Sequence, residues 1–159
     1  MQIYTVSFFG HRCVKNPCSI MRELEIIVRN LIREKEYVEF LVGRNGEFDQ
    51  LATSTVLRMK KQYRNDNSAV VLVLPYLTSE YTNNTESFES YYDLIEVCEE
   101  AANTHPKAAI QKRNRNMVDR SDLIICYVDT NSGGAYQTVQ YAIRKDKNVI
   151  NIVKKKTQE

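Results

Sequence analysis

"DLIICYVDTNSGGAYQTVQYAIRK" (residues 122–145) contains an apolar run, a polar loop with two adjacent glycines, and a segment whose apolar residues recur with helical spacing. This order is typical of a strand that leads through a tight turn into a helix. Because glycine tolerates backbone conformations that other residues avoid, Gly133 and Gly134 let the chain turn sharply and approach a ligand closely. The stretch predicts a strand-to-helix unit with a glycine-rich loop at the carboxyl end of its strand.

The same alternation of strand-like and helix-like segments extends over the whole chain. Runs rich in β-branched and aromatic residues predict strands at 3–9, 37–43, 69–75, 93–97, 122–128 and 148–153. Helical periodicity predicts helices at 19–35, from 48 onward, at 106–120 and after the glycines. The polar, tyrosine-rich stretch at 76–93 is interpreted as a long loop or lid, and the sequence leaves its helical content open. We therefore expect an α/β fold, a single Rossmann-like domain over residues 1–153 with a mostly parallel, doubly wound sheet and helices on both faces. Residues 154–159 are expected to form a basic polar tail.

The composition favours a globular protein with little general affinity for nucleic acid. Hydrophobic residues make up 43% of the 159 residues, which is enough for one buried core. The 22 Lys and Arg residues against 20 Asp and Glu residues give a formal charge of only +2, too small to attract a polyanion in general. The one basic run, Lys154–Lys156, is interpreted as a solvated tail rather than an arm that follows phosphates. Nucleic acid is disfavoured as a partner without being excluded.

Neither a targeting segment nor a membrane span is predicted. Met1 leads directly into a strand-like run, and no apolar stretch is long enough to cross a bilayer. We therefore expect a cytoplasmic protein with no membrane partner, and the apolar surroundings of Cys126 agree with a reducing compartment. Cys13 and Cys18, beside His11, lack the spacing and the second ligand pair of a zinc site, so no metal is expected.

Three loops are expected to meet at one edge of the sheet, because ligands of such folds bind beyond the carboxyl ends of the strands. The loops are GHRC (10–13), GRNGEFD (43–49) and DTNSGGAYQT (129–138). Glycine lets the backbone approach a ligand, and the free N–H groups of a helix's first turn attract an anion. Phosphate is the natural occupant, held at Gly133 and Gly134 with a donor from Ser132 or Thr138. A tight turn without a ligand is the alternative explanation for the two glycines.

Basic residues adjoin these loops. Arg12 and Arg44 stand at strand exits, and Arg113 and Arg115 stand on a predicted helix. An arginine in such a place can hold a phosphate or a carboxylate through two parallel hydrogen bonds. A solvated helix face is the alternative for Arg113 and Arg115. His11 is either a ligand contact or a turn residue.

Four motifs follow one another along the chain: FFGHR (8–12), GRNGEFDQLA (43–52), RNRNMVDRSDLIICYVD (113–129) and GGAYQTVQYA (133–142). Together they resemble the YpsA-like proteins of the SLOG superfamily, a Rossmann-like group that includes the LOG phosphoribohydrolases and the DNA-processing protein DprA. The resemblance extends from Phe8 to about Ile152. It implies a nucleotide or nucleotide-derived ligand, with phosphate at the two glycines and base or ribose near the first two loops. Homo-oligomers are also typical of the family.

The resemblance also assigns positions. Those that match the family motifs are Gly10, Arg12, Gly43, Phe48, Asp49, Ala52, Arg113, Asn114, Asp119, Gly133, Gly134, Thr138 and Ala142. His11, Arg44, Asn45 and Ser132 join the candidate ligand contacts because they lie in the same loops. Phe48 is expected in the core, and Asp49 has an alternative role as a cap at the start of a helix.

The chain departs from the LOG pattern at one position. LOG enzymes carry a glutamate after the glycine turn, where this sequence has Gln137 or Gln140, depending on the placement of a gap. Cleavage of an N-glycosidic bond needs such a carboxylate, so catalytic residues stay unassigned and another acid would have to serve. The acids near the predicted loops are Glu47, Asp49, Asp119 and Asp129.

Three functions stay open from the sequence. The first is a module that senses or sequesters a nucleotide such as an ADP-ribose-like or cyclic species, with no cofactor beyond that ligand. The second is hydrolysis of an N-glycosidic bond in a nucleotide. The third is DprA-like binding of single-stranded DNA. A tyrosine cluster in the long segment after the third strand either stacks on a base as a lid or forms an ordinary aromatic surface: Tyr76, Tyr81, Tyr91 and Tyr92.

Overall fold

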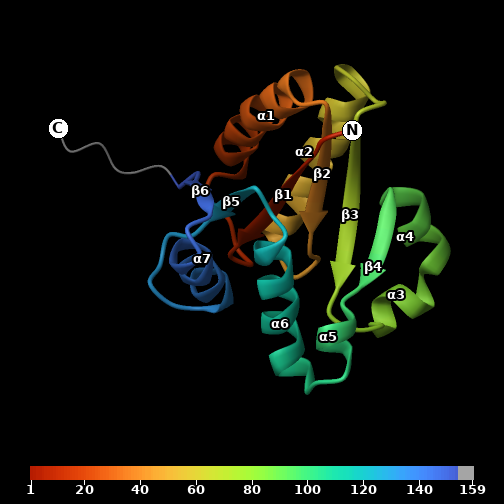
Figure 1. Cartoon of the computed structure of the whole chain (residues 1–159), viewed down its shortest axis with the longest axis vertical. Coiled ribbons are helices and arrows are strands. Elements are labelled where there is room, and N and C mark those ends of the chain that lie inside the picture. The colour runs from red at the N-terminus through yellow and green to blue at the C-terminus, as the bar shows by residue number, and fades with distance from the viewer. Residues whose placement is uncertain (154–159) are drawn as a thin grey trace.

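The computed structural model describes residues 1–153, and within them six parallel strands form one sheet (Figure 1). The order β4-β3-β2-β1-β5-β6 means that the chain winds outward from β1 in one direction and then returns to the other side. This topology confirms the predicted doubly wound, Rossmann-like α/β fold, with every pair of neighbouring strands parallel. The strands are β1 (Ile3–Gly10), β2 (Tyr37–Val42), β3 (Ser68–Leu74), β4 (Leu94–Val97), β5 (Leu123–Tyr127) and β6 (Asn148–Asn151).

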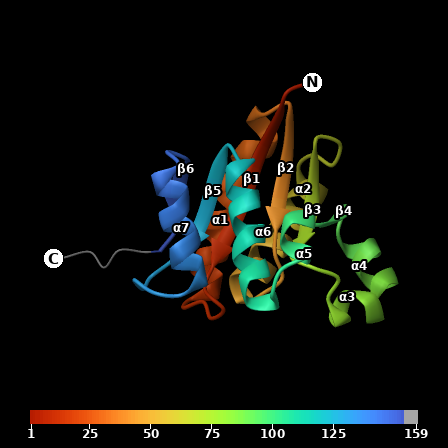
Figure 2. The ribbon, with the colours of Figure 1, turned by 60° about the horizontal axis from the view of Figure 1, so that its bottom comes forward.

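Helices cover both faces of the sheet, as predicted (Figures 1 and 2). The apolar side chains of α1 (Pro17–Glu34) and α2 (Glu47–Gln62) pack on one face, and those of the helices that follow β4 pack on the other. Helices α3 (Ser79–Asn83) and α4 (Thr85–Tyr91) lie beside β4 at one end of the sheet (Figure 1). The remaining helices are α5 (Glu99–Ala102), α6 (Pro106–Asp119) and α7 (Gly134–Arg144).

The core follows from the alternation of side chains along each strand. In β1, Phe8 faces α1 and α2 and lies 6.0 Å from Phe40, measured between ring centroids, whereas its neighbour Phe9 faces α6. Strand β3 is buried along its whole length, as a continuously apolar run requires when both faces of a parallel strand are covered. The apolar runs of the sequence therefore determine the three layers.

The direction of winding reverses at β1, and this reversal positions the site. Strand β1 has β2 on one side and β5 on the other, and Gly10 pairs in register with Tyr127. The N–H of His11 continues the ladder by donating to the carbonyl oxygen of Tyr127 over 3.2 Å. The loops that follow β1 and β5 consequently leave the sheet side by side, where ligands of doubly wound folds bind.

The structure differs from the predictions mainly after β3. The expected long loop at 76–93 contains α3 and α4, because the Oγ1 of Thr78 caps α3 by accepting the N–H of Tyr81 over 3.2 Å, and Phe88 of α4 is buried. Helix α5 had no periodicity long enough to predict it, and β6 ends at Asn151 instead of residue 153. The expected basic tail lies outside the described residues. Within residues 1–153, no helix is both long and apolar enough to span a bilayer.

Candidate functional site

The three predicted loops meet at the carboxyl edge of the sheet. The N–H of Glu47 donates to the carbonyl oxygen of Arg12 over 2.9 Å, and Oε2 of Glu47 accepts the N–H of Val14 over 2.6 Å. These bonds join the loop after β1 to the start of α2. The Nε2 atom of His11 accepts the backbone N–H of Asp129 over 3.0 Å, which joins the same loop to the one after β5. His11 therefore connects two loops.

A pocket of about 150 Å³ lies between these loops, α6 and the start of α7; we call it the small pocket. Helix α6 contributes Ile110, Gln111 and Met117 to its wall. The structure brings together most of the candidate ligand contacts here. The candidates that line the small pocket are Gly10, His11, Arg12, Gly43, Asn45, Asp49, Arg113, Asn114 and Gly134.

The first turn of α7 faces the small pocket. Glycine is favoured at positions 133 and 134 for different reasons. Gly133 has a φ of 97°, in the left-handed region that favours glycine. Gly134 lies against α6, and a Cβ there would be 3.2 Å from Nε2 of Gln111. Within the described part of the chain, no side chain caps the amides of this turn. Uncapped N–H groups at the positive end of the helix dipole suit an anion.

Gly10 is required by packing rather than by a ligand. A Cβ at Gly10 would fall on the ring of Phe48, closer than any real contact. Phe48 is fully buried, as expected, and its ring lies between those of Phe8 and Tyr127, with centroid distances of 6.5 and 6.1 Å. The expectation that the space at Gly10 admits a ligand is corrected, because this aromatic ring fills it.

Arg113 is a buried structural cation and neither grips a phosphate at the surface nor lies on a solvated face. Only 3% of it is exposed, and its Nη1 donates to the carbonyl oxygen of Val73 over 3.1 Å. Its Nε and Nη2 donate to Oδ1 of Asn114 over 3.1 and 3.0 Å. Burial lowers the pKa of Arg113, against the raising effect of the Asp49 charge. The solvated-face alternative is therefore wrong for Arg113, because helical spacing alone does not show which face packs on the sheet.

Asp49 lies opposite Arg113 at the start of α2. Its Oδ2 accepts the N–H of Asn45 over 2.8 Å, which ties the loop before α2 to the first turn of that helix. The alternative of an N-terminal cap is wrong, because the capping position is Gly46 and no side chain of the described residues bonds the free amides there. Burial raises the pKa of Asp49, and this effect outweighs the lowering effects of the Asn45 N–H and the Arg113 charge. Asp49 thus presents a carboxyl group with an elevated pKa to the small pocket, which suits a proton donor.

Asn114 and Thr138 support the start of α7 from beneath. The Nδ2 of Asn114 donates to Oγ1 of Thr138 over 3.1 Å, and this hydroxyl donates to the carbonyl oxygen of Gly134 over 2.9 Å. Since Arg113 donates to Asn114, hydrogen bonds run from the buried guanidinium to the first turn of α7. The sequence predicts that the Thr138 hydroxyl donates to a phosphate. Thr138 is only 1% exposed, however, and its hydroxyl positions the turn instead.

Three further candidates do not line the small pocket: Asp119, Arg44 and Ser132. Asp119 ends α6, and its Oδ1 accepts the hydroxyl of Tyr141 over 2.7 Å. It does not line the pocket, although Met117 two residues earlier on α6 does. Arg44 follows Gly43 directly but turns to the opposite side of the loop. The exposed loop before α7 holds Ser132, whose carbonyl oxygen accepts the hydroxyl of Thr130 over 3.2 Å.

The glutamines at the LOG-glutamate position lie outside the small pocket. Gln137 and Gln140 line a groove on the outer side of α6 and α7, together with Arg115. Arg115 is exposed and covers the ring of Tyr141, with its Cζ 5.3 Å from the centroid. Arg115 thus fits the predicted solvated face, unlike Arg113.

Asp49 is the one acid of the four considered that lines the small pocket. Oε2 of Glu47 accepts the N–H of Val14. Asp129 lies on the loop after β5, where its Oδ1 is 3.2 Å from Nε2 of His11. Among residues 1–153, no cluster of three or more His, Cys, Asp or Glu side chains has a geometry that could hold a metal ion. The lining of the small pocket offers amide groups, the guanidinium groups of Arg12 and Arg113, the imidazole of His11 and the carboxyl group of Asp49.

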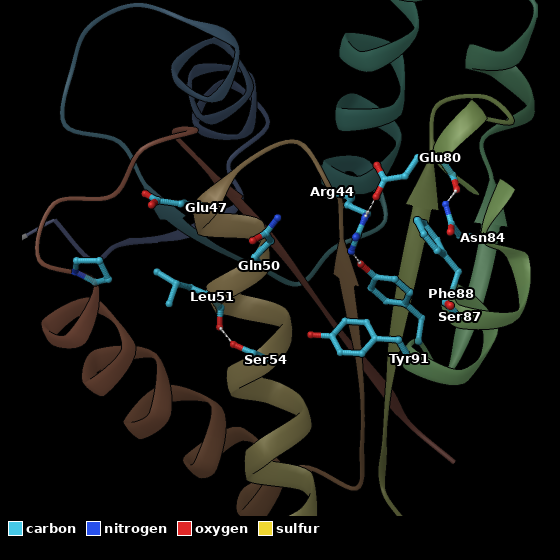
Figure 3. A pocket seen from close by; sticks show the side chains of 12 residues that line it. Arg44, Glu47, Gln50, Leu51, Ser54, Glu80, Asn84, Ser87, Phe88 and Tyr91 are labelled. Atoms are coloured by element: carbon cyan, nitrogen blue, oxygen red, sulfur yellow. Dashed lines mark hydrogen bonds and ion pairs between the residues drawn. The ribbon is translucent and has the colours of Figure 1, made fainter. Parts of the chain in front are cut away.

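A second, larger concavity of about 850 Å³ lies between α2 and the α3–α4 segment (Figure 3). No sequence pattern predicts this concavity, because α3 and α4 are too short to show a clear helical period. Tyr91 and Tyr92 line it, whereas Tyr76 packs toward the opposite face of the sheet, so the four tyrosines do not form one lid. We call it the α2–α4 groove, lined by Pro17, Arg44, Glu47, Gln50, Leu51, Ser54, Glu80, Asn84, Ser87, Phe88, Tyr91 and Tyr92.

Solved structures share this fold. DNA processing protein A from Streptococcus pneumoniae superposes with a TM-score of 0.71 at 16% identity, over 97% of this chain and 52% of that protein. DNA processing protein A from Helicobacter pylori, described with a single-stranded DNA binding mode, gives 0.69 at 15% identity, over 98% and 67%. The molybdenum cofactor carrier protein from Chlamydomonas reinhardtii gives 0.56 at 13% identity, over 93% and 75%.

These identities establish the fold alone, and the chain spans about half the length of the Streptococcus protein. No curated protein matches the sequence. The family model YpsA, described as the YspA SLOG family, matches residues 9–156, which include all four motifs at the carboxyl edge from Phe9 onward. This match covers nearly the whole chain, and the predicted resemblance is confirmed: the chain belongs to the YpsA family of SLOG proteins.

Proposed function

We propose that this chain binds a nucleotide or nucleotide-derived small molecule through its phosphate, as a sensor or sequestering module. One observation carries the proposal: the uncapped first turn of α7 opens onto the small pocket beside His11 and Arg12. A helix N-terminus carries roughly half a positive charge, and its free N–H groups donate to phosphate oxygens. Arg12 is exposed, so its guanidinium can reach the same anion.

The size of the small pocket favours phosphate as the enclosed part of the ligand. Its volume of about 150 Å³ lies below the range of roughly 300–1,000 Å³ for sites that enclose a whole small molecule. The phosphate occupies the pocket, and ribose and base extend over the loops at Gly43 and Asn45. Membership of the SLOG family and the fold shared with DNA-processing proteins support a nucleotide-related ligand.

Calorimetry tests this proposal with AMP, ADP, ADP-ribose and cyclic AMP, each against the matching nucleoside. We expect at least one phosphorylated compound to bind, and Arg12→Ala to weaken it about tenfold or more, because a charge-assisted hydrogen bond is lost. Arg64→Ala is the matched control: Arg64 is an exposed arginine paired with Asp66 after α2. Silence across the phosphorylated panel would refute the proposal. Binding only of an oligonucleotide, weakening steeply with salt, would favour single-stranded DNA instead.

Hydrolysis of an N-glycosidic bond is a second candidate, favoured by the carboxyl group of Asp49 in the small pocket. A carboxyl with a raised pKa can protonate the leaving base while water adds to the anomeric carbon. The C–N bond breaks, and the proton lost by the water restores Asp49. Chromatography of the same incubations detects the released base. If base release disappears in Asp49→Asn while phosphate-dependent binding is retained, the protein is a hydrolase that uses Asp49. If the nucleotide binds without any release of base, the protein acts as a binding module only.

A further inference from the structure

The α2–α4 groove is separate from the small pocket. Its volume of about 850 Å³ lies within the usual range for small-molecule sites, and the two share no lining residue. The chain passes between them after β2, with Gly43 lining the small pocket and Arg44 lining the groove. A ligand in the groove is therefore distinct from the phosphate site proposed above.

One wall of the groove is aromatic. Tyr91 is 43% exposed, and its ring meets that of Tyr92 edge to face at a centroid distance of 5.0 Å, which leaves a ring face open. Figure 3 shows Tyr91 pointing from α4 across the groove toward Ser54 on α2. Leu51 is the apolar contact from α2. A flat ring held by its neighbour, opposite an apolar side chain, suits a planar aromatic ligand.

Two charged residues of the groove, Arg44 and Glu80, are paired with each other. Arg44 donates from Nε to Oε1 of Glu80 over 2.5 Å and from Nη1 to the hydroxyl of Tyr92 over 3.0 Å (Figure 3). Its Cζ also lies 4.7 Å from the ring centroid of Phe88. The lining holds this one cation against the two carboxylates of Glu47 and Glu80, so its formal charge is negative. Phosphate is disfavoured here, because the cation is engaged and the excess charge is negative.

Polar groups that can donate and accept complete the wall: the side chains of Gln50 and Ser87 are exposed. An uncharged planar ring with both donors and acceptors matches these groups and the Tyr91 ring. We propose that the α2–α4 groove is a second binding site, for an uncharged nucleoside or free nucleobase that stacks on Tyr91. The site goes beyond the phosphate-dependent binding proposed above and does not need it.

Calorimetry and saturation-transfer NMR with adenosine, guanosine, cytidine and uridine test the groove, using the full chain. We expect at least one nucleoside to bind, Tyr91→Ala to weaken it about tenfold or more, and Tyr91→Phe to change it less than about threefold, because stacking supplies most of the affinity. Tyr63→Ala is the matched control, since Tyr63 is 50% exposed at the end of α2, outside the groove. Unchanged melting temperatures establish that the variants fold.

Arg12→Ala separates the two sites. Nucleoside binding that depends on Tyr91 and ignores Arg12→Ala supports the groove, even if every phosphorylated compound fails to bind. Nucleoside binding that falls with Arg12→Ala and not with Tyr91→Ala places the nucleoside in the small pocket and overturns the groove. Absence of binding by all four nucleosides at millimolar concentration also overturns it, whether or not nucleotides bind.

Discussion

The side chains of Asp49 and Arg113 converge on the α-carbon of Gly43 from two different helices. A Cβ at Gly43 would lie 3.3 Å from Oδ2 of Asp49 and 3.2 Å from Nη1 of Arg113. Both groups are buried, and burial shifts each toward its neutral form, raising the pKa of Asp49 and lowering that of Arg113. The two side chains thus crowd the same glycine beneath the small pocket, and the charge of each acts on the pKa of the other.

Arg113→Met should destabilise the protein by about 3 kcal/mol, because it leaves the carbonyl of Val73 and the amide oxygen of Asn114 without their donor. Asp49→Asn should lower the free energy of unfolding by less than Arg113→Met does, because an amide oxygen can still accept the N–H of Asn45. Urea denaturation of both single variants and the double variant gives the coupling energy. Additive losses would show that the two side chains do not interact.

The stability conferred by Asp49 should fall as pH rises. Its pKa is raised in the folded state above the ordinary 3.8, so folded protein keeps a proton that unfolded chain has lost. Below 3.8 both states hold the proton and the penalty is absent, and above the folded-state pKa it is complete. The free energy of unfolding of wild type minus that of Asp49→Asn should therefore decrease from about pH 4 upward. A difference that increases with pH would contradict the raised pKa.

Gly10→Ala should destabilise the protein by about 1–3 kcal/mol, because the new methyl group falls on the buried ring of Phe48. Phe48→Leu removes atoms from that spot and should recover part of the loss when combined with Gly10→Ala. Thermal unfolding of the four proteins completes the cycle. If the second change gives no relief, the fit between Gly10 and Phe48 is not the cause.

Gly134→Pro should weaken phosphate binding severalfold while the protein stays folded. Proline is favoured at the first helical position, where its missing N–H has no partner in the helix, and here it deletes one donor of the proposed cradle. Gly134→Ala keeps the N–H and adds only a methyl group beside the flexible end of Gln111. Calorimetry with the tightest phosphorylated compound compares them. Equal affinities would place the phosphate elsewhere.

Sequence patterns predicted the layers of the fold and the edge at which the loops meet. The apolar run of β5, the two glycines and the helical period of α7 specify a strand, a turn and a helix locally, and the period is visible without tertiary contacts. Since parallel strands must end at one edge, the loops at Gly10, Gly43 and Gly134 were predicted as neighbours. Such reasoning fails for side chains whose direction depends on packing.

Arg113 and Arg115 show why the direction of a side chain could not be predicted from the sequence pattern. Both are arginines on α6 and identical in local pattern, yet one is buried against Val73 and Asp49 while the other covers Tyr141 at the surface. The α2–α4 groove likewise depends on α3 and α4, whose short helices are held by a cap and by the burial of Phe88. Local periodicity and backbone chemistry were enough to predict the alternation of strands and helices and the glycine turn before α7. Which polar groups face the pocket was decided only by tertiary packing, because contacts between distant segments fix how each side chain is buried.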